Sequence, residues 1–153
     1  MSLARSLLIL TLALVLLPLG CKKDDSSPTS PGTGGIPASL VGTWTLDSVT
    51  VNGQAADLAT VFNWVPGTES ANITVDANGA YAYKELGGGG QVLFTNAGTI
   101  ALSGSNFTIT VTSKDGQPLA TAETLAGTWV ASGNTLTLTI ASPLGPVVVS
   151  GSK

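Results

Sequence analysis

Two stretches of the chain alternate threonine with a large apolar residue, and this alternation limits the fold more than any other feature. They are NFTITVT (106–112) and NTLTLTI (134–140). Successive side chains of a β-strand point to opposite faces, so each stretch predicts a strand with one buried and one solvated face. Strands of this kind are typical of antiparallel sheets. The sequence therefore predicts an all-β domain.

The same period of two recurs between turn residues through most of the chain. Asn78-Gly79 lies between two such runs and predicts a hairpin, and Asn96-Ala97 is expected to be another turn. About eight or nine strands fit an antiparallel up-and-down β-barrel of about eight strands, or alternatively a β-sandwich. The expected strands are 42–51, 71–75, 80–84, 91–95, 98–103, 106–112, 134–140 and 147–149.

The first strand changes phase along its length. Trp44 and Leu46 fall on one face, whereas Val49 and Val51 fall on the other. A bulge or bend near Asp47 would keep both pairs inside, and barrels place bulges at their corners.

One short helical turn is predicted between residues 54 and 67. Leu58, Val61, Phe62 and Val65 are spaced for a single apolar stripe before a Pro-Gly pair ends it. This turn is expected to cap one end of the sheet structure.

Three stretches resemble lipocalin-like domains of the calycin group, in particular those of bacterial lipoproteins. LVGTWTLDSV (40–49) is similar to their opening strand, ITVDANGAYAY (73–83) to an early hairpin and LAGTWVASGNTLTLTI (125–140) to a later one. The resemblance implies a lipocalin-like barrel that could hold a small hydrophobic molecule.

In that family a Gly-X-Trp at the first strand places the tryptophan across the closed end of the barrel. Gly42 and Trp44 match this pattern, and Gly127 and Trp129 repeat it. Glycine permits close backbone approach and tryptophan fills a wide end of a core, so all four are expected to be structural barrel-end residues.

The first 20 residues read as a secretory signal peptide. Arg5 precedes an apolar run, 7–19, that is shorter than the roughly 20 residues of a spanning helix. Cys21 is the chain's single cysteine, so it has no partner for an intrachain disulfide. With Leu19 and Gly20 it resembles the lipobox of bacterial lipoproteins, which implies an acylated Cys21 and a membrane anchor; the alternative is an ordinary signal peptide that leaves a free thiol.

Residues 21–37 are predicted to be a lipidated N-terminus followed by a flexible Ser/Pro/Gly tether, with the β domain at 38–153. Residues 22–25, two lysines and two aspartates, resemble a signal for the outer face of the outer membrane, or serve as a plain spacer. The expected location is the bacterial cell envelope, as an outer-membrane lipoprotein that could be exposed at the surface.

Charge excludes several function classes. From residue 36 onward three lysines face seven acids, a net charge of −4, so nucleic-acid binding has no electrostatic basis. The chain has no histidine, which removes histidine-based triads and the commonest metal ligand. We therefore expect neither an enzyme nor a metal or cofactor site, although two distant acids could still meet in space as a glycosidase-like pair.

Four aromatic residues are the candidate ligand contacts: Tyr81, Tyr83, Phe94 and Phe107. They are expected to face inward, either lining a cavity for a small apolar ligand or simply filling the core. A second function class stays open, a surface structural or interaction protein whose threonine-rich outer faces contact another protein or a glycan. The sequence identifies no protein partner.

Overall fold

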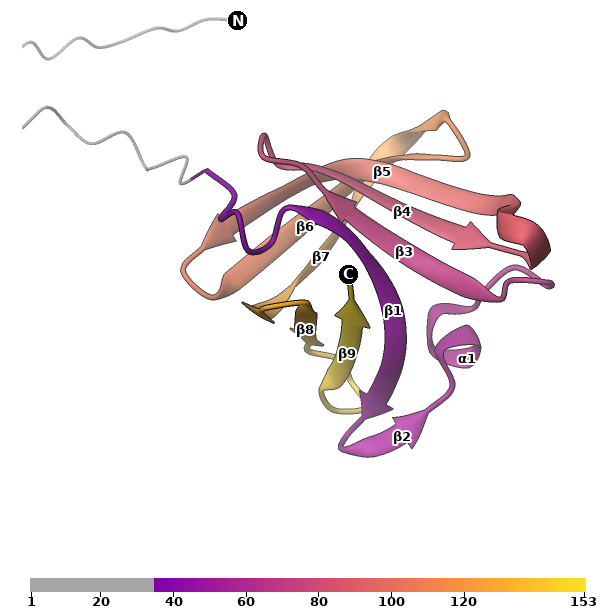
Figure 1. Cartoon of the computed structure of the whole chain (residues 1–153). Helices are drawn as coiled ribbons and strands as arrows, with labels where there is room; N and C mark the ends of the chain where they lie inside the picture. Colours follow the sequence, from indigo (N-terminus) through magenta and orange to yellow (C-terminus); the bar gives the residue numbers. More distant parts are fainter. Residues whose placement is uncertain (1–34) are drawn as a thin grey trace, which may run out of the picture. The chain divides into compact units, whose positions relative to one another are not determined.

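The computed structural model describes residues 35–153, which form nine β-strands, one short α-helix and one 3-10 helix (Figure 1). The predicted signal peptide, Cys21 and most of the predicted tether lie outside the described residues. The helices are α1 (Leu58–Phe62) and η1 (Gly88–Gly90). The strands are β1 (Gly42–Val51), β2 (Gln54–Ala56), β3 (Ser70–Val75), β4 (Ala80–Leu86), β5 (Val92–Ser103), β6 (Asn106–Lys114), β7 (Gln117–Ser132), β8 (Thr135–Ile140) and β9 (Val147–Ser152).

The sheet closes on itself into an eight-stranded barrel. From β3 to β9 each strand pairs antiparallel with the next, and β1 pairs with β3 through residues 42–45 and with β9 through residues 45–51. β2 is a short extra strand that pairs with the end of β1. The closure confirms the predicted up-and-down barrel, because the pairing of β1 with β9 leaves no break between two separate sheets.

β1 pairs with both β3 and β9 because it bends in its middle. Its register with β9 shifts between Leu46 and Ser48, which leaves Asp47 as the extra residue. Trp44, Leu46 and Val49 are all buried as a result. The bulge predicted from the change of phase is confirmed, since a regular strand would turn either the tryptophan or the valine outward.

The two strands expected at 91–95 and 98–103 are one continuous strand, β5. Asn96 and Ala97 pair with both β4 and β6, and the register with β6 shifts between Ala97 and Gly98. A Cβ atom at Gly98 would collide with the backbone oxygen of Thr110. The predicted turn was wrong because a glycine at a bulge, where two backbones approach closely, reads in sequence like a turn residue.

Trp44 closes one end of the barrel. Its side chain is fully buried and its indole N–H donates to the backbone oxygen of Leu40 over 2.9 Å. The Lys153 ammonium lies 4.2 Å from the centre of the indole ring, a cation–π contact. The same ammonium donates to the backbone oxygens of Ser39 and Val41, at 3.3 and 3.0 Å. The last residue of the chain thus ties down the segment that enters β1.

The core is built from Leu40 and from inward residues of seven of the eight barrel strands, and partly buried side chains of β7 pack against it. Ile36, which precedes the first strand, also packs against this core. These core residues all lie within residues 35–153, inside one compact unit of the chain, so a polypeptide of residues 35–153 contains the whole described core. The buried apolar residues are Leu40, Trp44, Leu46, Val49, Ala71, Ile73, Val75, Tyr81, Tyr83, Ile100, Phe107, Ile109, Val111, Leu136, Leu138 and Val149.

The opposite end of the barrel carries α1, which confirms the predicted helical turn. Asp57 caps the helix: one carboxylate oxygen accepts from the backbone N–H and the hydroxyl of Thr60, at 2.8 and 2.7 Å. These hydrogen bonds lower the pKa of Asp57. The helix ends at Asn63, whose backbone is left-handed with φ of 50°. The polypeptide then returns to β3 past Trp64 and Val65.

Strand β7 pairs with β8 over only part of its length. Residues 127–132 pair with 140–135, whereas the earlier part of β7 pairs with β6 alone. The barrel wall therefore parts between these two strands near the α1 end.

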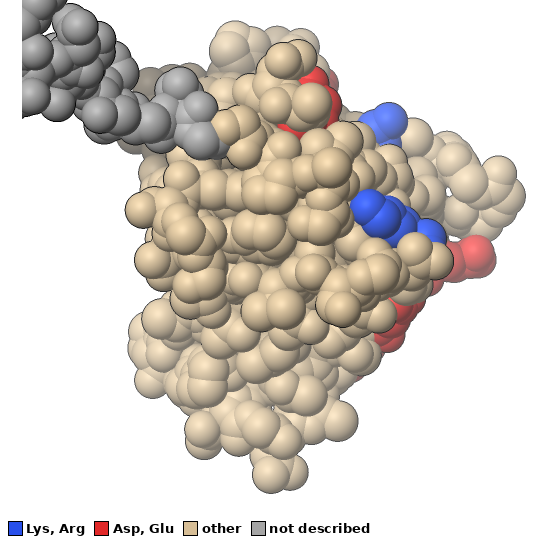
Figure 2. All heavy atoms as spheres, turned by 60° about the vertical axis from the view of Figure 1, so that its left-hand side comes forward, with Lys and Arg blue, Asp and Glu red and all other residues tan. Residues whose placement is uncertain are grey.

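Charged side chains are sparse over the face shown in Figure 2, in keeping with a chain that is only 10% charged. Among residues 35–153, no helix has the length and apolar character needed to cross a membrane.

Candidate functional site

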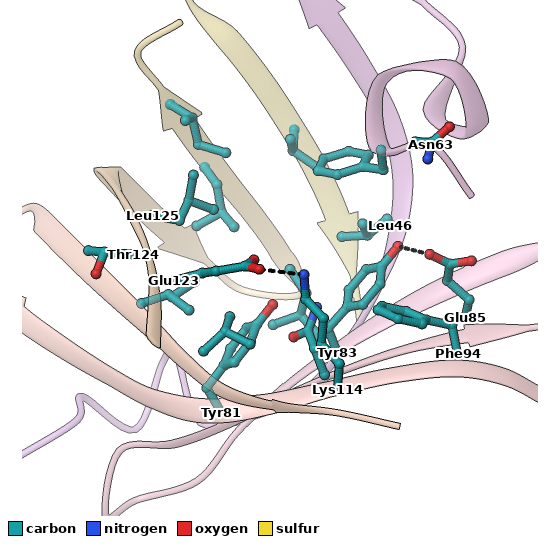
Figure 3. Close-up of a pocket in the computed structure, with 18 of the residues that line it drawn as sticks. Leu46, Asn63, Tyr81, Tyr83, Glu85, Phe94, Lys114, Glu123, Thr124 and Leu125 are labelled. Atoms are coloured by element: carbon teal, nitrogen blue, oxygen red, sulfur yellow. Dashed lines mark hydrogen bonds and ion pairs between the residues drawn. The ribbon is translucent and has the colours of Figure 1, made fainter. Parts of the chain in front are cut away.

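A cavity of about 570 Å³ occupies the half of the barrel nearer α1 (Figure 3). Every barrel strand contributes to its wall, and α1 with the residues after it adds one side of its mouth. Its volume lies within the usual range of about 300 to 1,000 Å³ for small-molecule sites. The lining residues are Leu46, Phe62, Asn63, Val65, Ile73, Tyr81, Tyr83, Glu85, Phe94, Asn96, Ile109, Val111, Lys114, Glu123, Thr124, Leu125, Leu138, Ile140 and Val149.

Glu85 is the one buried charged residue in the described part of the chain, with 2% of its surface exposed. One oxygen of its carboxylate accepts from the backbone N–H of Val65 at 2.8 Å and from the hydroxyl of Thr68 at 3.0 Å. The other accepts from the Tyr83 hydroxyl at 3.2 Å (Figure 3). Three donors and no acceptor face it, an arrangement that suits a carboxylate. Glu85 thereby ties the loop after α1 to strand β4.

Both tyrosines of the chain lie on β4 and line this cavity. Burial raises the pKa of Tyr81, and burial together with the neighbouring Glu85 carboxylate raises the pKa of Tyr83. The two phenols are therefore neutral at physiological pH and act as hydrogen-bonding groups. Within residues 35–153 the Tyr81 hydroxyl makes no hydrogen bond, and it is not one of the fully buried unpaired atoms, so a ligand in the cavity can reach it.

Asn96 on β5 adds a second unused polar group. It lies directly across from Tyr83 in the β4–β5 pairing, so both side chains share the inner face. Its side-chain oxygen is buried and accepts no hydrogen bond from the described residues. Buried polar atoms are normally satisfied, so this oxygen is a local exception, and it has essentially no surface that a ligand in the cavity could reach.

An ion pair lies at the mouth. Lys114, at the end of β6, and Glu123, on β7, are 2.7 Å apart, and their side chains are 38% and 57% exposed. Glu123, Thr124 and Leu125 lie on the part of β7 that has no β8 neighbour, and all three line the cavity. The mouth is thus polar and the interior mainly apolar.

The structure brings three of the four candidate ligand contacts to this cavity. Tyr81, Tyr83 and Phe94 line it, and the rings of Tyr83 and Phe94 meet edge to face with centroids 6.3 Å apart. Phe107 does not line it. Phe107 pairs with Gly127 nearer the closed end, and its ring occupies the space that a side chain at Gly127 would need. Phe107 is 1% exposed, so it fills the core.

The four predicted barrel-end residues are placed as follows. Gly42 has φ of 137°, which favours glycine, and lies beside Lys153. Trp44 is buried at the closed end, whereas Trp129 is only half-buried and donates from its indole N–H to the backbone oxygen of Gly104 at 3.2 Å. A Cβ atom at Gly127 would collide with the backbone of β8. Gly127 thus permits close approach of two strands.

Sequence reasoning missed the polar members of the cavity. Glu85 had a usable signal, since it stands two residues after Tyr83 and strand alternation turns both side chains inward. Asn96 is predicted from the sequence to lie in a turn, whereas the structure places it within β5. Lys114 and Glu123 are nine positions apart, with a turn and an irregular stretch of β7 between them, and no local pattern indicates that they meet.

Two further predictions bear on the site. Cys21 lies outside the described residues. Within residues 35–153 there is no cluster of three or more acidic, cysteine or histidine side chains that could hold a metal ion.

Comparison with known families places this geometry in context. The sequence profile described as a lipocalin-like domain matches residues 40–122, more than half of the chain and strands β1 to β6 of the barrel. A comparison with curated proteins found no match.

Proposed function

Because the chain belongs to the family of lipocalin-like domains, we propose that its barrel binds a small apolar molecule in the cavity at the α1 end. The observation that carries the proposal is the cavity itself: about 570 Å³, with mainly aliphatic and aromatic walls and a few convergent polar groups. Trp44, near the start of β1, is fully buried and does not line this cavity.

A neutral fluorescent probe tests this proposal directly. N-phenyl-1-naphthylamine brightens in apolar surroundings, and we expect it to bind residues 35–153 with a saturable signal and a stoichiometry of one. Val111→Trp places a large side chain inside the cavity and should abolish the signal. Thr112→Trp, at the next position, is the matched control, because Thr112 is exposed and does not line the cavity.

The comparison of the two variants decides the location of the probe. Circular dichroism would first establish that both are folded, since an added large side chain in a core can cost about 1 to 3 kcal/mol. Equal binding by the wild type and Val111→Trp would refute binding in this cavity. Loss of binding in Thr112→Trp alone would place the probe on the outer face of the sheet.

We further propose that Cys21 is acylated and that the protein is a lipoprotein of the bacterial outer membrane. Support comes from the short apolar run before Gly20, the single cysteine and the Ser/Pro/Gly-rich segment after it. More than one acyl chain gives stable attachment, at about 0.8 kcal/mol per buried methylene. Mass spectrometry of the mature N-terminus should show an acylated Cys21, and Cys21→Ser should release the protein from membranes. Membrane retention of Cys21→Ser would refute the anchor.

We propose a binding role without catalysis. The cavity holds three charged side chains, of which Lys114 and Glu123 are paired with each other and Glu85 is occupied by three donors. No histidine or cysteine lines the cavity. This arrangement supplies hydrogen bonds and apolar surface to a ligand but no free acid–base pair.

A further inference from the structure

The charges that line the cavity are unevenly matched. Two carboxylates, Glu85 and Glu123, face a single ammonium, that of Lys114. The ammonium is engaged by Glu123 at 2.7 Å, and this is the one ion pair among the described residues. Glu85 is therefore held by neutral donors alone, and its negative charge is not matched by any cation in the cavity.

This unmatched charge acts on anything that enters. Glu85 is 2% exposed, so solvent screens it poorly. Two like charges about 10 Å apart, at an effective dielectric constant of about 20, correspond to roughly a tenfold loss of affinity. An apolar ligand with a carboxylate head would meet this repulsion and would find the one cation already occupied.

The cavity wall also carries a neutral hydrogen-bonding group, the Tyr81 hydroxyl, which can donate or accept. A ligand hydroxyl can therefore pair with Tyr81 in either direction without bringing a charge into the cavity. A carboxylate can only accept from Tyr81, and it brings a second negative charge toward Glu85.

We propose that the cavity selects apolar molecules whose polar group is a neutral hydroxyl and discriminates against carboxylates such as fatty-acid anions. The inference rests on the proposed function, because it specifies the ligand class of the same cavity.

The test is a displacement assay with two ligands that share one alkyl chain. N-phenyl-1-naphthylamine bound to residues 35–153 would be competed with 1-decanol and with decanoate at about pH 7.5, where the acid is ionised. We expect 1-decanol to bind at least tenfold more tightly. Equal or tighter binding of decanoate overturns the inference while leaving the proposed function intact. Failure of the neutral probe to bind at all overturns the proposed function itself, and the inference with it.

Two variants, Glu123→Gln and Tyr81→Phe, test the roles of charge and of the hydroxyl in ligand binding, and Glu69→Gln is the control for the change in charge. Glu123→Gln releases Lys114 from its ion pair, so the preference for 1-decanol over decanoate should fall about tenfold. Glu69→Gln removes the same charge from an exposed position outside the cavity lining, and it should keep the wild-type preference. Tyr81→Phe removes the unused hydroxyl and should lower the affinity for 1-decanol at least threefold. A preference that stays the same in Glu123→Gln and Tyr81→Phe would contradict the assignment of these groups.

Discussion

Replacement of Glu85 by leucine should destabilise the barrel, although leucine is apolar and the position is buried. The substitution removes the acceptor for three donors: the backbone N–H of Val65, the hydroxyl of Thr68 and the hydroxyl of Tyr83. It also removes a carboxylate that is costly to bury, which offsets part of the loss. The loss outweighs this gain, because a hydrogen bond to a charged group contributes about 1.5 to 3 kcal/mol and three of them are removed.

The magnitude follows from the burial of those donors. Val65 and Thr68 are partly exposed, so water can replace part of what they lose, whereas Tyr83 is 7% exposed. At about 1 kcal/mol for each of the three hydrogen bonds, Glu85→Leu should cost about 3 kcal/mol. Glu85→Gln keeps one acceptor oxygen and should cost about half as much.

Urea unfolding followed by tryptophan fluorescence measures the effect on residues 35–153. With a slope of about 1 to 3 kcal/mol per molar urea, the midpoint of Glu85→Leu should fall by about 1 to 3 M. Glu69→Leu supplies a control for the change from an acid to leucine at an exposed site. A midpoint for Glu85→Leu equal to or above that of the wild type would show that the carboxylate does not hold the loop after α1, and the reasoning would fail.

The remaining predictions concern the tyrosines, the closed end and one bulge. Because burial raises the pKa of Tyr81 and Tyr83, neither phenol should ionise near pH 10.0 in an absorbance titration, and the stability gained by keeping them neutral is full below that pH and lost as the pH rises further. Ionisation near pH 10.0 without unfolding would contradict their burial. Lys153→Met removes the cation over Trp44 and should lower the free energy of unfolding by about 1 kcal/mol. Urea unfolding measures this effect, and Lys84→Met, at an exposed lysine on β4, is the control. Gly98→Ala should cost about 4 kcal/mol or more, or prevent folding, and a thermal midpoint within a few degrees of the wild type would contradict the close approach of β5 and β6.

Much of the strand pattern could be predicted because burial enforces alternation. Phe107, Ile109 and Val111 fall on one face in the sequence and are buried in the structure. The phase change in β1 predicted its bulge for the same reason, since Trp44 and Val49 can both be inside only if one extra residue lies between them. Local sequence carries this information because each strand has one inner face.

Long-range pairing could not be predicted in the same way. Residues 117–126 show no regular alternation, and the early part of β7 is largely exposed, so no burial pattern marks it as a strand. Its existence depends on the hairpin with β6. The sequence predicts that Gly98 begins a strand, because sequence alone does not distinguish a glycine that permits close approach from one that ends a turn.

The cavity depends on where β7 leaves β8, and this explains why inward aromatics alone could not reveal it. On the closed side, where the two strands pair, Phe107 packs against Gly127 and fills the interior. Beyond that point β7 follows β6 alone, and its Glu123 reaches Lys114 at the cavity mouth. The same parting of strands therefore opens the volume for a ligand and engages the one cation that could have attracted an anionic headgroup. Shape and charge preference in this barrel have a common structural origin.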